Sequence, residues 1–174
     1  SPSMRKRPQV QRLFMPEAGP AAIAVAVNDE LHYCWDAGEC RLRYIWKGDF
    51  IDGWAVWRGN GNGLAKIQGE VLLREEKNPV PYLDLVDSAR PRPKFLGYSL
   101  VEGLPTFRWR AGKIEVTETI RPTSDGKALT RSFAVTGEIP SALKFKSSDK
   151  MSVSTESAVL DGNGRLTVTL TPKP

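Results

Sequence analysis

The chain has 174 residues, of which 40% are hydrophobic and 26% are charged. These values are ordinary for a globular protein, so they exclude a fibrous or wholly disordered chain, and the length suits one domain with its own core. The formal net charge is +5, but four positive charges fall within the first twelve residues, at Arg5, Lys6, Arg7 and Arg12. The other basic residues are interleaved with acidic ones, so the charge pattern argues against nucleic acid as a partner.

The start of the chain differs in composition from the rest. Residues 1–10 are predicted to be a flexible basic arm. Ser-Pro-Ser before Met4 is expected to be a remnant of the expression vector. Residues 11–174 are predicted to form a single domain. No run of about 18–20 apolar residues occurs, so no membrane span is expected.

The first segments of this domain have strand character. Residues 23–27 and 31–35 are apolar runs on either side of Asn28-Asp29-Glu30, and this pattern predicts a β-hairpin. Residues 41–46 (RLRYIW) alternate in polarity, which predicts a half-buried strand. We expect one face of this strand to carry Leu42, Tyr44 and Trp46, and the other to carry Arg41 and Arg43.

The only two cysteines flank a predicted turn. Cys34 and Cys40 are separated by Trp-Asp-Ala-Gly-Glu, which is typical of a strand end, a turn and a strand start. Such a hairpin would set the two Cβ atoms opposite each other, a geometry that accepts a disulfide worth about 2 kcal/mol. Two buried free thiols are the alternative. Zinc is not expected, because His32 is the only histidine and the ligands are too few.

The rest of the chain also has strand character. Residues 64–76 approach a helical apolar stripe, but Gly69 and the β-branched residues favour a strand over 70–74. Residues 77–93 contain four prolines and are predicted to connect two sheets. Further strands are predicted at 95–101, 106–110, 113–120, 129–135 and 165–171. Many short strands separated by turn residues predict an all-β fold, an antiparallel β-sandwich of two packed sheets with little or no helix.

Most catalytic and cofactor motifs are missing from the sequence. The single histidine, His32, sits in a strand without a Gly-x-Ser-x-Gly elbow, so a hydrolase triad and histidine-rich metal sites are not expected. There is no Cys-x-x-Cys-His, so no haem is expected on this segment. No cofactor is predicted.

Two carboxylates lie beside tryptophans. Asp49 and Asp52 are three residues apart, between Trp46 and Trp54, and a pair of carboxyl groups is the requirement for glycoside cleavage. Asp beside Gly is also ordinary turn chemistry. With Glu118, these acids define one alternative, a carboxylate-based sugar-active enzyme.

Aromatic residues concentrate next to a glycine-rich stretch. Trp54, Trp57 and Arg58 precede residues 59–63 (GNGNG), and they combine flat ring faces with hydrogen-bond donors, as sugar-binding sandwich modules do. Trp54 and Trp57 are an odd number of residues apart, so a regular strand would send them to opposite faces. The predicted ligand-binding residues are Trp46, Asp49, Asp52, Trp54, Trp57 and Arg58.

The residues 14–25, 33–38 with 40–52, and 95–98 with 105–107 resemble an uncharacterised β-rich region of secreted bacterial proteins. In those proteins the region is found beside c-type cytochrome modules and propeller domains similar to soluble sugar dehydrogenases. The resemblance implies export to the periplasm or beyond, an oxidised Cys34–Cys40 pair, and an accessory or substrate-binding role. It carries no catalytic residue that can be transferred.

Three function classes therefore remain. The first is a non-catalytic module that binds carbohydrate or cell-wall polymer through the aromatic residues. The second is a docking module for a c-type cytochrome or a dehydrogenase, using a positive surface that includes Arg41 and Arg43. The third is the carboxylate-based enzyme.

Overall fold

The computed structural model describes residues 6–52, 66–75, 92–138 and 142–174, and these ranges contain strands and turns but no helix. The strands are β1 (Gln9–Met15), β2 (Gly19–Ala26), β3 (Leu31–Asp36), β4 (Arg41–Asp52), β5 (Lys66–Arg74), β6 (Lys94–Val101), β7 (Leu104–Ala111), β8 (Ile114–Pro122), β9 (Leu129–Gly137), β10 (Leu143–Lys144), β11 (Met151–Val153), β12 (Ser157–Ala158) and β13 (Arg165–Pro172). No helix in these ranges is long and apolar enough to cross a bilayer.

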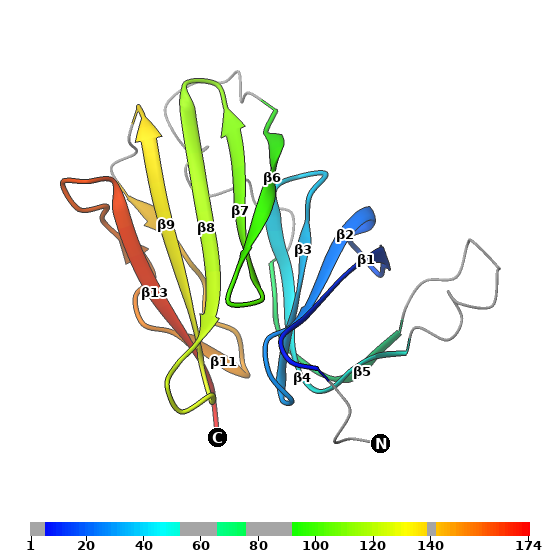
Figure 1. Ribbon diagram of the computed structural model, residues 1–174. Helices are drawn as coiled ribbons and strands as arrows, with labels where there is room; N and C mark the ends of the chain where they lie inside the picture. Colours follow the sequence, from blue (N-terminus) through cyan, green and yellow to red (C-terminus); the bar gives the residue numbers. More distant parts are fainter. Residues whose placement is uncertain (1–5, 53–65, 76–91, 139–141) are drawn as a thin grey trace.

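The strands form two large antiparallel sheets. Sheet A has the order β1-β2-β3-β4-β5, and sheet B has the order β11-β13-β9-β8-β7-β6, while β10 and β12 pair separately. Figure 1 shows sheet A in blue to green and sheet B in green to red. The chain passes from sheet A to sheet B between Arg74 and Lys94, an interval that contains the predicted connection over residues 77–93. The predicted all-β sandwich is confirmed.

Short turns join several pairs of neighbouring strands. Between β2 and β3, the Asn28 side-chain oxygen accepts hydrogen bonds from the backbone N–H groups of Glu30 and Leu31, at 2.9 and 2.8 Å. Between β6 and β7, Glu102 and Gly103 both have positive φ, the backbone conformation of a two-residue hairpin turn whose twist matches the strands. The predicted hairpin over 23–35 and the predicted strand over 70–74 are confirmed.

The main core lies between the sheets. Alternate residues of β7, β8, β9 and β13 point inward and are buried. At its centre, the ring of Trp35 from β3 stacks on Phe107 from β7, with centroids 4.1 Å apart, and lies 5.6 Å from Trp109. Both sheets therefore contribute aromatic rings to one core.

A second core lies on the other face of sheet A, and a β-bulge in β4 turns Tyr44 and Trp46 toward it. Cys34 pairs with Tyr44 but the next residue, Trp35, pairs with Leu42, so Arg43 is an extra residue in β4. Leu42 consequently faces sheet B, whereas Tyr44 and Trp46 face the second core. The prediction that Leu42, Tyr44 and Trp46 share one face is wrong, because the bulge reverses the alternation between them.

The end of the predicted basic arm is ordered. Strand β1 begins at Gln9, and Arg7 donates a hydrogen bond from Nε to the backbone oxygen of Asn28 at 3.2 Å. The Arg7 guanidinium also lies over the Phe50 ring, 5.8 Å from its centroid. Arg7 therefore ties the start of the chain to the β2–β3 turn and to β4.

Candidate functional site

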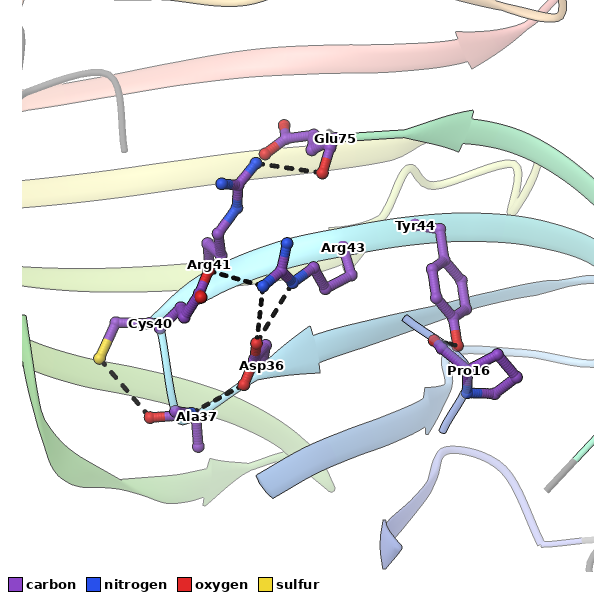
Figure 2. Close-up of polar contacts among 10 residues, drawn as sticks. Pro16, Asp36, Ala37, Cys40, Arg41, Arg43, Tyr44 and Glu75 are labelled. Carbon is purple, nitrogen blue, oxygen red and sulfur yellow. Dashed lines mark hydrogen bonds and ion pairs between the residues drawn. The ribbon is translucent and has the colours of Figure 1, made fainter. Parts of the chain in front are cut away.

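The two cysteines are free thiols on opposite faces of sheet A. Cys34 packs into the second core beside Tyr44, whereas Cys40 lies in the β3–β4 turn and belongs to the core between the sheets. In the turn, the Cys40 thiol donates to the backbone oxygen of Ala37 at 3.8 Å (Figure 2). The predicted disulfide is wrong because the residue opposite Cys34 is Tyr44. Burial raises the pKa of both thiols to about 12, so they are protonated at neutral pH.

The arginines of β4 do not form the outward basic surface that a docking module would need. Arg43 donates two hydrogen bonds to the Asp36 carboxylate, at 3.0 and 3.2 Å, and another to Glu39 at 2.6 Å. Arg41 is buried, 8% exposed, and donates to the backbone oxygen of Glu75 at 3.0 Å. As Figure 2 shows, both guanidinium groups are engaged within the protein. The predicted docking role for Arg41 and Arg43 has no support in this arrangement.

The predicted aromatic site is only partly described. Trp46 is fully buried, and its indole N–H donates to the backbone oxygens of Asp49 and Phe50, at 3.1 and 2.9 Å. The Asp49 residue is exposed on β4, opposite Gln68. Trp54, Trp57 and Arg58 lie outside the described residues, as does the side chain of Asp52, which ends β4 opposite Lys66. Trp46 is thus a core residue, whereas Asp49 is an exposed residue of the same strand.

His32 is a buried member of the second core. Its Nε2 donates to the backbone oxygen of Gly48 at 2.6 Å, and among the described residues Nδ1 finds no hydrogen-bond partner. The ring lies against Trp46 and Phe50, with centroids 5.5 and 5.2 Å away. Burial, helped by the charge of Arg7, lowers the pKa of His32 despite the Gly48 hydrogen bond. His32 is therefore neutral in the folded protein near pH 7.

Acidification should destabilise the fold through His32. As the pH falls below 6.5, the ordinary histidine pKa, the unfolded chain takes up a proton that the folded protein does not. The free energy of unfolding should therefore fall by up to about 1.4 kcal/mol per pH unit until the lowered pKa is reached. Urea denaturation between pH 7 and pH 5 measures this loss. In His32→Gln, which keeps an N–H for the Gly48 oxygen, the contribution of His32 to this slope should disappear, so the slope should differ from that of the parent; an unchanged slope would contradict this assignment.

A charged network occupies the interior between the sheets. On the inner face of sheet B, Arg131 of β9 donates from Nε to the Glu118 carboxylate at 2.8 Å, and from Nη1 to Glu75 at 2.6 Å. The second oxygen of Glu118 accepts the indole N–H of Trp35 at 3.1 Å. The Arg131 guanidinium is also covered by the rings of Phe133 and Phe145, at 5.1 and 5.5 Å. The network links β8 and β9 of sheet B to β3 and the end of β5 in sheet A.

The network holds Glu118 away from solvent. Glu118 is 1% exposed, and burial raises the pKa of its carboxyl group while the neighbouring Arg131 opposes that rise. Both of its oxygens already accept hydrogen bonds from protein groups. Glu118 therefore offers no carboxylate to a substrate, and the enzyme alternative loses this residue. Arg131 and Glu75 were not singled out from the sequence, although Arg131 stands at an inward position between Leu129 and Phe133.

The outer face of sheet B is open and rich in hydroxyl groups. The strand register aligns one hydroxyl side chain from each of five adjacent strands. This set, called the hydroxyl row, consists of Ser99 (β6), Thr106 (β7), Thr119 (β8), Ser132 (β9) and Thr167 (β13). All five residues are exposed or half-exposed, and the Ser132 and Thr167 hydroxyls are 2.9 Å apart. A line of hydrogen-bonding groups thus crosses the sheet.

A second row on the same face carries positive charge. On each of the five strands, the residue two positions from the hydroxyl row, toward the same end of the sheet, is also in register with its neighbours. These residues are Gly97, Arg108, Thr117, Ala134 and Arg165. Arg108 and Arg165 are exposed, and in the described part of the chain no carboxylate lies within 4.0 Å of either. Two other arginines of this face are paired, Arg110 with Glu115 and Arg121 with Glu102, each at 3.5 Å. Guanidinium groups available to a ligand therefore flank the hydroxyl row.

Comparisons with protein-family models, curated proteins and solved structures find no match to this chain. In the described residues, no group of three or more His, Cys, Asp or Glu side chains could hold a metal ion. The resemblance to a region of secreted bacterial proteins, the location outside the cytoplasm and the cytochrome or dehydrogenase partner all stay predictions. The open face of sheet B is a described surface on which hydroxyl and guanidinium groups are exposed side by side.

Proposed function

We propose that the protein is a non-catalytic module that binds carbohydrate on the outer face of sheet B. The observation that carries this proposal is the hydroxyl row, in which five neighbouring strands each present one Ser or Thr to solvent. A Ser or Thr hydroxyl both donates and accepts hydrogen bonds, as the hydroxyl groups of a sugar do. Because the row is built on paired strands, its groups are held in fixed relative positions.

The dimensions of the row favour a polymer over a single sugar. Neighbouring strands lie about 4.8 Å apart, so five strands span about 19 Å. Each hydrogen bond contributes about 0.5–1.5 kcal/mol, so a single sugar in contact with one or two hydroxyls would bind weakly. A polysaccharide laid along the row would make several such bonds at once. Cell walls contain such polymers, and a protein exported from the cell, as the sequence predicts for this one, would reach them.

Affinity electrophoresis on a panel of polysaccharides tests the proposal. We expect at least one polymer to retard the protein, and the triple variant Thr106→Val, Thr119→Val, Thr167→Val to bind at least about tenfold more weakly, because each valine keeps the shape of threonine but removes its hydroxyl. Ser124→Ala is the control, since Ser124 is an exposed turn residue between β8 and β9.

Two results would overturn the proposal in different ways. If no polymer retards the protein, the module does not bind carbohydrate. If a polymer binds the triple variant as well as the parent, the outer face of sheet B is not the binding surface. Loss of binding in Trp57→Ala, with the triple variant unaffected, would move the site to the aromatic residues that the sequence predicted.

A further inference from the structure

Resting on the proposed function, we infer that the ligand is an acidic polysaccharide whose carboxylate groups bind Arg108 and Arg165. Both arginines lie in the row beside the hydroxyl row: Arg108 follows Thr106 by two residues, and Arg165 precedes Thr167 by two. Two residues advance a strand by about 6.7 Å, so the two rows run parallel at that separation. A sugar chain on the hydroxyl row would thus have guanidinium groups along one side.

Among the residues that the structure describes, none occupies these two guanidinium groups with a carboxylate, so they can bind a ligand. The residues of the same row between or beside them are small, Gly97, Thr117 and Ala134, so no large side chain separates the arginines from a bound chain. The other arginines of this face, Arg110 and Arg121, already face carboxylates. Guanidinium groups bind carboxylates through two parallel hydrogen bonds, which gives both affinity and orientation.

The spacing of the charges favours a sugar polymer over nucleic acid. Arg108 and Arg165 are three strands apart, or about 14 Å between backbones. Duplex DNA carries one charge per about 1.7 Å, and a protein that binds it neutralises many phosphates at once. The outer face of sheet B also presents no described aromatic ring on which a base could stack. Sparse cations beside a line of hydroxyls suit a polymer with many hydroxyls and fewer acids.

Matched pairs of polymers test the charge of the ligand. We would compare polygalacturonate with its methyl ester, and carboxymethyl cellulose with hydroxyethyl cellulose, by affinity electrophoresis at low ionic strength. In at least one pair, the acidic member should bind about tenfold or more tightly than the neutral one, and added salt should weaken that binding. The variant Arg108→Gln/Arg165→Gln should bind both members of the pair equally.

The control keeps the same change in net charge. Lys127→Gln/Lys144→Gln removes two exposed positive charges from a turn and from β10, so it should retain the preference for the acidic polymer. If neutral polymers bind as tightly as acidic ones, or if the arginine variant keeps the preference, the inference is wrong while carbohydrate binding stands. If no polysaccharide binds, both proposals fail. A DNA duplex that binds more tightly than either acidic polymer would replace the sugar ligand with nucleic acid.

Discussion

Arg131→Ala should lower the free energy of unfolding by about 3–5 kcal/mol. The substitution removes the only described cation that contacts Glu118, and Glu118 is sealed between the sheets. A buried carboxylate without a partner either carries a large desolvation cost or binds a proton. Urea denaturation measures the loss, and Arg165→Ala, an exposed arginine on the outer face of sheet B, should change stability by less than about 0.5 kcal/mol.

The deficit of Arg131→Ala should depend on pH. Without Arg131, the pKa of Glu118 in the folded protein rises further above its unfolded value, so the folded state holds a proton that the unfolded state releases. The loss is therefore smaller at pH 5 than at pH 8. Replacing both partners with apolar residues, in Glu118→Leu/Arg131→Met, should recover most of the stability, because the fully buried carboxylate is removed with its partner and the remaining acid, Glu75, is partly exposed. A loss below about 1 kcal/mol in the single variant, equal at both pH values, would contradict this role.

Trp35→Ala should also destabilise the protein by about 3–5 kcal/mol, through a cavity at the centre of the core. Trp35 is fully buried and stacks on Phe107, with Phe95 and Trp109 at 5.5 and 5.6 Å, so its loss removes contacts between sheet A and sheet B. The substitution also leaves one oxygen of Glu118 without its indole donor.

Trp35→Phe separates these two causes. Phenylalanine retains most of the ring contacts but cannot donate to Glu118, so the expected loss is about 1–3 kcal/mol, smaller than that of Trp35→Ala. Thermal and urea unfolding of the two variants side by side provide the comparison. Equal losses in both would mean that the hydrogen bond, and not the volume of the ring, dominates the contribution of Trp35.

Local patterns predicted the strands well. The runs on either side of Asn28 form the β2–β3 hairpin, and the alternation in residues 129–135 and 165–171 matches the inward and outward residues of β9 and β13. These patterns succeed because a strand on the surface of a core must alternate between apolar and polar side chains. The bulge at Arg43 could not be predicted in this way, because nothing in the residues 41–46 shows where the pairing with β3 slips.

The position of the turn explains why the predicted disulfide does not form, because Asp36 pairs with Arg41 and Cys40 therefore lies inside the turn. The spacing of the cysteines fits a hairpin, but a disulfide needs Cys40 opposite Cys34, and the register places Tyr44 there. The expected outward position of Arg41 is wrong for a related reason, because Arg41 is buried where Glu75 approaches it from the end of β5. In both cases, the residues that surround the side chain are set by how the strands pair, and the local sequence does not reveal them.

The amino-acid sequence by itself determined that this chain folds as stacked antiparallel sheets, because the alternation and the turn residues act over a few positions. Only the tertiary structure decided which side chains meet. Thr106, Thr119 and Thr167 are far apart in the chain, and the register of three strand pairs brings them into one row. Arg131 and Glu118 likewise become an interior pair only when sheet A covers them. Register and sheet packing depend on contacts between distant segments, and no single segment encodes them.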